Sequence, residues 1–311
     1  MTLEYVDEVK AKAEALSISV IDAWEKQHGG GAPDVLWHYT GQLAFEGMSS
    51  SSEIWLTNAL FLNDKSELNY GIALTQRTLR DMKGRYSSPL IQKFLQDSSV
   101  SMQVTNLIVG AYVASFSEPD DLLSQWDRYA DQSKGYSIGF RAADLIKGRP
   151  HLQLRKVFYE ESEQVPIIEG IAEQFCNMLT REIDLSAATV YNNSVLHNSS
   201  MAMFDVFIQH LYCFKHRGFR EEQEWRLVET LKPVSGASKL RHRNSGTLTN
   251  VPYVVENVGV PGPSGIKLPI AEIYYGPRID PVVGERYLTN WFSSHDYRPL
   301  PKISRSTIPL R

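Results

Sequence analysis

Short runs rich in β-branched and aromatic residues are scattered through the chain, and helical stretches of unequal length separate them. The runs predict strands at 35–40, 53–58, 109–117, 135–140, 153–159, 251–255, 273–275 and 302–304. Apolar residues at helical spacing predict helices at 3–26, 65–82, 86–108, 122–129 and 164–214, with 184–198 as a candidate break. Because these elements do not alternate as regular βα units, they favour an α+β fold over a doubly wound parallel sheet.

The composition is that of an ordinary globular protein, with 42% hydrophobic and 22% charged residues among 311. The net charge of −4 argues against a uniformly basic nucleic-acid-binding surface, although it leaves a local basic patch open. Cys176 and Cys213 are far apart and lack metal-ligand spacing, which indicates buried thiols in a reducing compartment. No apolar run can span a bilayer, and the acidic first turns do not resemble a signal peptide, so we expect a cytoplasmic protein.

The stretch 215–229 begins basic and turns sharply acidic. Its alternation predicts a strand with two faces, one made of Glu222, Glu224 and Arg226 and the other of Gln223, Trp225 and Leu227. Like charges two residues apart on a strand repel, so one carboxyl should have a raised pKa unless a cation neutralises it. A solvated acidic face is the alternative explanation.

Two further groups of residues are candidates for binding. His38, Tyr39 and Thr40 end a predicted strand, and an imidazole followed by hydroxyl groups can hold a ribose or a phosphate. A buried core histidine is the structural alternative. Trp126 and Tyr129 share one face of a predicted helix, where aromatic residues either join the core or offer a flat surface for a ligand ring.

Other site classes have little support in the sequence. It contains no His-Glu-x-x-His, no clustered His/Cys set, no Gly-x-Ser-x-Gly and no Gly-rich phosphate loop, so we predict no metal site and no hydrolase, Rossmann or P-loop motif. Asp64 and Glu67 fit a helix cap with a capping-box carboxylate. Together with Glu222 and Glu224 they are the acidic set that a metal-dependent nuclease would require.

Several segments, in order along most of the chain, resemble the bacterial domain-of-unknown-function family 2971. They are residues 37–40, 54–58, 63–67, 115–117, 123–130, 135–140, 215–227, 273–277 and 306–311. The resemblance implies a single domain over residues 1–311, with an N-terminal helix and a mainly helical insertion at about 164–214. The family name implies no activity.

A weaker similarity is to the ADP-ribosyltransferase superfamily. Those enzymes have a first motif with His or Arg on a strand, an aromatic or hydroxyl second motif, and a late strand with Glu/Gln-x-Glu. His38 with Tyr39 and Thr40 matches the first motif, and Glu222-Gln223-Glu224 matches the last. The middle motif is not identified. This similarity implies a mixed, split β-sheet core and NAD as the substrate.

The same similarity implies catalytic roles for the two carboxylates. Cleavage of the nicotinamide–ribose bond passes through an oxocarbenium-like state, which Glu224 would stabilise while orienting the ribose 2′-hydroxyl. Glu222 would orient or deprotonate the acceptor. The implied activity is that of an NAD-dependent ADP-ribosyltransferase or NAD glycohydrolase, acting on an unknown protein or nucleic acid as a bacterial toxin or anti-phage effector.

The cofactor-binding roles are implied in the same way. His38 would hydrogen-bond the adenosine-side ribose, with Tyr39 and Thr40 beside it. Tyr129 or Tyr136 would stack on nicotinamide. Arg226 or Lys215 would pair with the pyrophosphate or hold the carboxylates in place. All of this requires the imidazole and the paired acids to line one common cleft.

A non-catalytic module that binds a nucleic acid or a protein is the alternative. Its site would consist of the basic residues Lys215, Arg217, Arg220, Arg241 and Arg243. Glu222 and Glu224 would then be ion-pair partners of these residues. The tract 239–243 also has a structural explanation, as a solvated loop.

Overall fold

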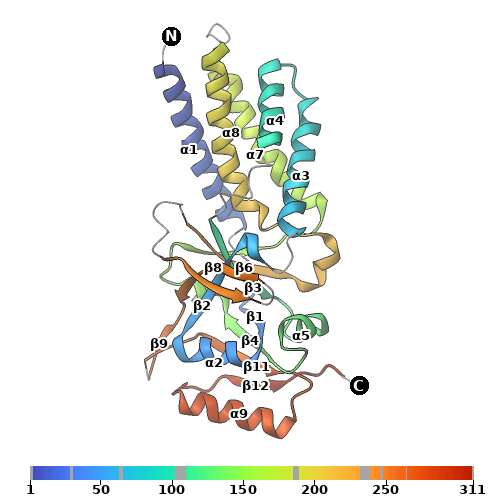
Figure 1. The fold of residues 1–311 in the computed structure, drawn as a ribbon. Helices are drawn as coiled ribbons and strands as arrows, with labels where there is room; N and C mark the ends of the chain where they lie inside the picture. Colours follow the sequence, from blue (N-terminus) through green and yellow to red (C-terminus); the bar gives the residue numbers. More distant parts are fainter. Residues whose placement is uncertain are drawn as a thin grey trace. The chain divides into compact units, whose positions relative to one another are not determined.

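The computed structural model describes residues 3–28, 31–62, 66–101, 110–184, 189–231, 239–245, 248–263 and 265–309 (Figure 1). The chain divides into two compact units. The first comprises Met1–Gly30, Ala59–Gly110 and Val157–Gly218, and the second comprises Gly31–Asn58, Ala111–Lys156 and Phe219–Arg311. Each unit is therefore assembled from segments that are far apart in the sequence.

The first unit is helical. Its main helices are α1 (Leu3–His28), α3 (Ser66–Lys83), α4 (Pro89–Ser101), α7 (Glu161–Glu182) and α8 (Thr189–Leu211), with a short 3-10 helix η1 (Ala59–Phe61). Helix α1 packs along α8, and α3 packs against α4 and α7, so each apolar face is buried against a neighbour (Figure 1). The helical stretch predicted at 164–214 thus consists of two helices. The cap predicted at Asp64 lies outside the described residues.

The second unit contains a large sheet. Its strands are β1 (Val35–Thr40), β2 (Glu53–Asn58), β3 (Ala111–Ser117), β4 (Tyr136–Arg141), β5 (Leu152–Lys156), β6 (Glu224–Thr230), β7 (Arg241–Ser245), β8 (Leu248–Asn257), β11 (Ile270–Tyr275) and β12 (Lys302–Arg305). They follow the order β12-β11-β4-β1-β3-β2-β8-β7, with β6 and β5 added beside β3. Strands β11 and β12 are parallel, and the other pairs of this sheet are antiparallel. The predicted α+β fold with a mixed sheet is confirmed.

The sheet forks at β3. Strand β6 pairs with β3 along its whole length, from Ala111 to Ser117. The other edge of β3 therefore carries two strands in succession, β2 at Tyr112 and Val113 and β1 at Ser117. Strands β1 and β2 leave β3 as separate branches, and the residues of β3 between them face the fork.

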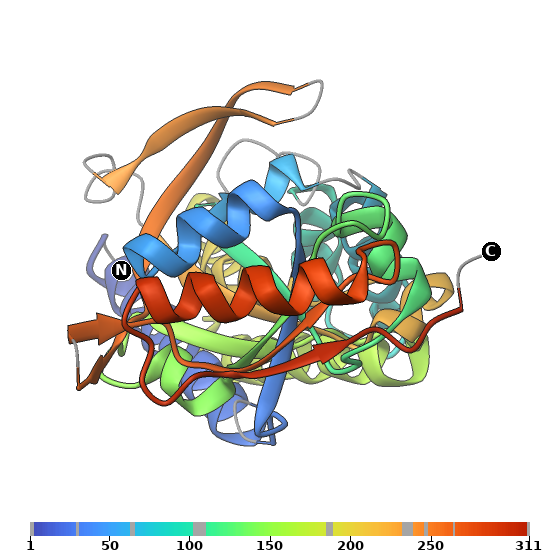
Figure 2. The same cartoon turned by 90° about the horizontal axis from the view of Figure 1, so that it is seen from below.

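One face of the sheet carries most of the hydrophobic core of this unit. Helices α2 (Gln42–Ser51), α6 (Ala142–Ile146) and α9 (Pro281–Ser294) contribute to that core, and α2 and α9 run side by side (Figure 2). Tyr287 donates a hydrogen bond to Glu46 at 2.7 Å, and the Trp291 indole donates one to the Ser49 hydroxyl at 2.9 Å. Asp280 begins α9 by accepting hydrogen bonds from the first free backbone N–H groups.

A smaller aromatic cluster lies on the opposite face. Helix α5 (Leu123–Tyr129) places Trp126 against Trp37 and Tyr39, with Tyr129 packed at the margin. The Trp37 ring lies over Gly139, where a Cβ atom would approach it to 2.8 Å. A glycine at this position of β4 therefore makes room for the tryptophan.

Two loop predictions are wrong. The tract 239–243, interpreted as a solvated loop, includes the start of β7, which pairs with β8. The stretch from Gly259 to Gly265, whose Gly and Pro residues predict a loop, lies instead in a small hairpin of β9 (Val260–Gly262) and β10 (Gly265–Lys267). In both cases backbone pairing with a neighbouring strand decides the conformation, and the local sequence carries little β propensity.

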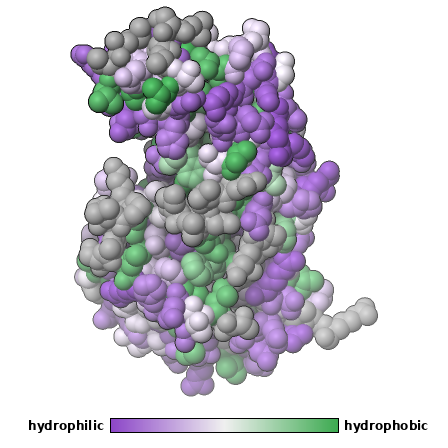
Figure 3. All heavy atoms as spheres, turned by 45° about the horizontal axis from the view of Figure 1, so that its top comes forward, coloured by the Kyte–Doolittle hydropathy of each residue, from purple (hydrophilic) through white to green (hydrophobic). Residues whose placement is uncertain are grey.

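None of the described helices has the length and apolar character that a transmembrane segment requires. On the face drawn in Figure 3, hydrophilic side chains predominate, and hydrophobic ones form separate groups among them. Scattered exposed apolar residues of this kind are normal for a folded protein and mark no binding surface by themselves.

Candidate functional site

The acidic strand begins later than its alternation predicts. Glu222 ends a 3-10 helix, η3 (Arg217–Glu222), and β6 starts at Glu224. Gln223 between them has φ of 42°, in the left-handed region that side chains other than glycine seldom adopt. This residue interrupts the two-residue alternation. The prediction that Glu222 shares one strand face with Glu224 and Arg226 is therefore wrong.

Glu224 and Arg226 do share a face of β6, and they form a buried ion pair. The Arg226 Nε atom donates to Glu224 Oε1 at 2.7 Å, and a terminal nitrogen donates to Oε2 at 3.0 Å. Both side chains are buried. A buried charge requires a close partner, and a two-point guanidinium–carboxylate pair also fixes the plane of the carboxylate. The carboxylate of Glu224 is thus held in one orientation.

Glu222 has a different arginine partner. An Arg128 terminal nitrogen lies 3.2 Å from Glu222 Oε1, and the Arg128 guanidinium lies 5.8 Å from the centre of the Phe219 ring. The Ser117 hydroxyl donates to the backbone carbonyl of Glu222, which ties the end of η3 to β3. Each of the two neighbouring carboxylates therefore has its own cation, which offsets their mutual repulsion.

His38 lies at the fork of the sheet. Its Nδ1 atom is 2.9 Å from the Ser115 carbonyl oxygen, and its ring centre is 5.6 Å from that of Phe116. Since a carbonyl oxygen only accepts hydrogen bonds, Nδ1 carries the proton and donates. Ser115 lies between the points where β1 and β2 pair with β3, so the imidazole links β1 to β3 inside the fork. Burial lowers the pKa of His38 below its ordinary value of 6.5, against the effect of the Ser115 carbonyl.

The lowered pKa of His38 predicts an acid-sensitive fold. Between the folded-state pKa and 6.5, the unfolded chain binds more protons than the folded one, so stability falls as pH falls through that window. We expect His38→Gln to flatten the plot of unfolding free energy against pH from 7 to 5, where one group contributes at most about 1.4 kcal/mol per pH unit. Urea denaturation at several pH values measures this. The assignment of this pH dependence to His38 is contradicted if His38→Gln leaves the slope of that plot unchanged. It is also contradicted if His242→Gln, at an exposed histidine, changes the slope equally.

His38 and Glu224 project from opposite faces of the sheet. Antiparallel partners that lie directly opposite each other share a face, and Ser117 is the partner of both Trp37 and Glu224. His38 follows Trp37 on β1, so its side chain points to the other face, where Phe116 lies. The expectation that the imidazole and the acids line one common cleft is therefore wrong. Alternation within a strand shows which of its own residues share a face, but the register between strands decides whether residues of two different strands share one.

The other cofactor-binding candidates divide between the same two faces. Thr40 shares the face of His38, whereas Tyr39 lies on the face of Glu224. The Tyr39 hydroxyl donates to the Pro119 carbonyl and accepts from the Leu122 N–H, both at 3.0 Å, and burial raises its pKa. These bonds attach the loop before α5 to β1.

The two tyrosines expected to stack on nicotinamide have different surroundings. Tyr136 is enclosed between Phe45 and Tyr287 in the core, and burial raises its pKa to about 12. A ligand ring can reach it only by displacing those side chains. Tyr129 on α5 is partly buried against the aromatic cluster that contains Trp37, on the face of Glu224. Of the two, only Tyr129 lies on the side of the carboxylates.

Lys215 belongs to the first unit. Its ammonium lies 2.9 Å from Glu67 Oε1, and the lysine side chain is buried. Glu67 is one of the acidic residues that the nuclease interpretation would require. This contact places a cation directly against that carboxylate.

One basic residue of the β7–β8 hairpin, Arg243, stacks with aromatic side chains. The Arg243 guanidinium lies 5.3 Å from the Trp55 ring centre and 5.5 Å from that of Tyr253, and it donates to the Thr57 hydroxyl at 2.9 Å. Trp55 on β2 is 44% exposed, and Arg241, which lies on β7 with Arg243, is also exposed. The hairpin projects from the sheet in Figure 2. These residues form the surface that a binding module would present.

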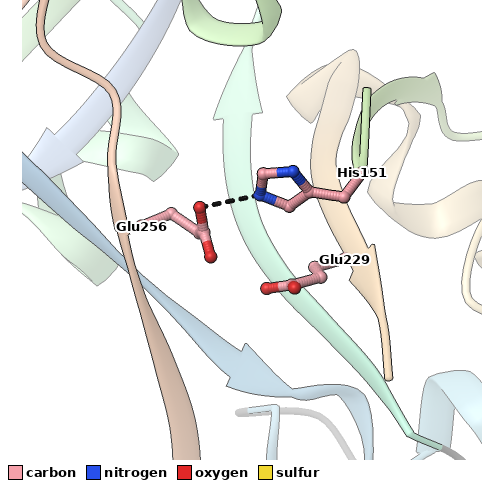
Figure 4. Close-up of side chains that lie close together, drawn as sticks. All are labelled: His151, Glu229 and Glu256. Atoms are coloured by element: carbon pink, nitrogen blue, oxygen red, sulfur yellow. Dashed lines mark hydrogen bonds and ion pairs between the residues drawn. The ribbon is translucent and has the colours of Figure 1, made fainter. Parts of the chain in front are cut away.

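Three side chains that no sequence motif predicts to lie together form a cluster, His151, Glu229 and Glu256 (Figure 4). One ligand atom from each lies within 4.8 Å of the other two. Lys239 bridges the two carboxylates, at 2.6 Å from Glu229 Oε1 and 3.3 Å from Glu256 Oε1. Burial raises the pKa of Glu229. Burial also tends to raise the pKa of Glu256, but the contacts with His151 and Lys239 outweigh it, and the pKa of Glu256 is lowered.

A weak signal of this cluster is present in the sequence. Glu229 follows Trp225 and Leu227 at the positions of β6 that face the core, and Glu256 follows Val254 in the same way on β8. A carboxylate that continues an apolar alternation indicates a buried charge with a specific partner. The partners come from distant parts of the chain, so no local spacing reveals them.

Comparison with known proteins finds one family. Residues 125–227 match the family model described as "Protein of unknown function (DUF2971)", from α5 to the Glu224–Arg226 pair. No curated protein and no solved structure matches the chain. The match supports the resemblance to that family over this part of the chain. It names no activity and lends no support to the similarity to ADP-ribosyltransferases.

Proposed function

We propose that the protein consumes NAD in the manner of an ADP-ribosyltransferase, with Glu224 as the catalytic carboxylate. One observation carries the proposal: two carboxylates, each held by its own arginine, lie at the start of a strand that pairs with the forked strand of the sheet. Oriented carboxylates are what a reaction with a developing positive charge on a sugar requires.

The chemistry assigns a role to each member of the group. The bond between ribose C1′ and the nicotinamide nitrogen breaks, and nicotinamide leaves with the electron pair. Glu224, fixed by Arg226, stabilises the resulting oxocarbenium-like carbon. The acceptor oxygen or nitrogen then bonds to C1′, and Glu222 takes its proton. With water as the acceptor the outcome is NAD hydrolysis, and with a macromolecule it is ADP-ribosylation.

Helix α5 supports this assignment from the same face. It carries Arg128, which binds Glu222, and Tyr129, the tyrosine positioned on the side of Glu224. The proposal does not require the imidazole and the acids to share one cleft, because His38 projects to the opposite face and takes another role. His38 is a positioning residue that links β1 to β3 at the fork.

The test is nicotinamide release from NAD by the purified full chain, alone and with cell extract. Glu224→Gln keeps the shape of the side chain and removes its charge, and we expect it to lower the rate on the order of 100-fold. Glu272→Gln is the matched control, because Glu272 is also a strand carboxylate in an ion pair, with Lys302 at 2.6 Å. We expect that variant to keep the wild-type rate.

Two outcomes contradict the proposal. One is an unchanged rate in a folded Glu224→Gln protein, and the other is no NAD consumption by the wild type in any extract. A different result favours the binding module instead. In that case the protein binds single-stranded nucleic acid, the binding weakens steeply with salt, and Arg241→Ala reduces it while Glu224→Gln does not. The exposed Trp55 and the Arg243 stack are the observations behind that second candidate.

A further inference from the structure

The cluster of His151, Glu229 and Glu256 is built from three separate elements of the second unit. Glu229 lies on β6 opposite Leu152 of β5, and His151 immediately precedes Leu152. Glu256 lies near the end of β8, paired with Ile54 of β2. The His151 Nε2 atom is 2.9 Å from Glu256 Oε2. Figure 4 shows the imidazole and both carboxylates pointing toward one another.

A second observation points to a ligand. The Glu229 side chain is 2% exposed, and its Oε2 atom is buried without a hydrogen-bond partner. Carboxylate oxygens removed from water are normally satisfied by donors or by a metal ion. The structure therefore contains a buried acceptor that lies within the cluster.

The charges of the cluster also do not balance. Two acidic side chains face one ammonium, that of Lys239, so the acidic groups outnumber the lysine cation. A divalent cation in the place of the ammonium would balance both carboxylates. The Lys239 side chain is 48% exposed, so it can withdraw into solvent at small cost. The His151 side chain is 42% exposed, which gives an ion a route from solvent.

The backbone around the cluster is fixed independently of any ion. Arg149, two residues before His151, donates to the Asn257 carbonyl at 2.8 Å and to the Gly259 carbonyl at 2.7 Å. These bonds fasten the turn that carries His151 to the end of the strand that carries Glu256. Preorganised ligands of this kind are typical of metal sites in folded proteins.

We propose that His151, Glu229 and Glu256 bind a divalent transition-metal ion, in competition with the ammonium of Lys239. One imidazole nitrogen and two carboxylate oxygens are ligands that Zn²⁺ accepts, and three protein ligands leave a position open for water or another group. Glu229 and Glu224 lie on opposite faces of β6, so this site is separate from the carboxylates of the proposed function.

The experiment is a calorimetric titration of the chelator-treated full chain with Zn²⁺, and with Mg²⁺ as a contrast. We expect one Zn²⁺ per chain and weaker binding of Mg²⁺. His151→Ala and Glu229→Gln should each weaken Zn²⁺ binding at least 10-fold, because each removes one ligand. Lys239→Met should tighten it, because the competing cation is gone. Circular dichroism of each variant confirms that it is folded.

Matched controls separate this site from a surface histidine or a general charge effect. His242→Ala removes an exposed histidine on β7, and Lys302→Met removes a lysine from another carboxylate pair. Neither should change Zn²⁺ binding. The proposal is overturned if neither the wild type nor Lys239→Met binds Zn²⁺. It is also overturned if His151→Ala binds Zn²⁺ as tightly as the wild type does. The gain expected for Lys239→Met keeps the test decisive if Glu229→Gln fails to fold.

Discussion

Replacing Arg226 with methionine is expected to lower the free energy of unfolding by about 3–5 kcal/mol. The guanidinium makes a two-point pair with Glu224, and both side chains are buried. Methionine fills much of the same volume but leaves the buried carboxylate without this cation. The cost is therefore that of taking a close cation away from a buried carboxylate, and little of it comes from lost packing. Urea denaturation followed by circular dichroism measures the change.

The double variant Glu224→Leu/Arg226→Met provides the control for charge. It removes both partners at once, so we expect it to recover most of the stability that Arg226→Met loses. Lys302→Met removes a lysine that is 68% exposed from its pair with Glu272, and it should cost less than about 1 kcal/mol. The interpretation of a buried ion pair is contradicted if Arg226→Met lowers the free energy of unfolding by less than about 1 kcal/mol. It is also contradicted if the double variant is no more stable than Arg226→Met.

Local patterns were sufficient to predict much of the fold. The runs at 35–40 and 53–58 coincide with β1 and β2, and the α+β class follows from the order of the elements. These strands are continuous β-branched and aromatic stretches, so local propensity and burial agree. The hairpin strand β7 was missed because it consists of Arg, His, Asn and Ser residues. Only its pairing with β8 makes it a strand.

The site depended on features that local patterns do not contain. Gln223 adopts a left-handed backbone conformation that its residue type gives no reason to expect, and this removes Glu222 from the strand. The face on which His38 lies is set by the register of β1 and β6 against β3, which is a property of the assembled sheet. The pairing of Glu224 with Arg226, in contrast, follows directly from their spacing of two.

Trp126→Ala is expected to lower the free energy of unfolding by about 3–5 kcal/mol. The indole is 0% exposed and lies edge-on to Tyr39, with ring centres 5.1 Å apart. Its Nε1 atom donates to the Asp121 carboxylate at 2.6 Å. Alanine would leave a cavity between α5 and β1, together with a carboxylate that has lost a donor. Because α5 also carries Arg128, the loosened helix should hold Glu222 less firmly.

Trp55→Ala is the matched control, since it removes the same side chain from a position that is 44% exposed. We expect it to cost less than half as much as Trp126→Ala, because little apolar area returns to water. Trp126→Phe should retain part of the stability by filling most of the cavity without restoring the hydrogen bond. Equal losses for Trp126→Ala and Trp55→Ala would mean that the packing of α5 against β1 does not stabilise the sheet unit.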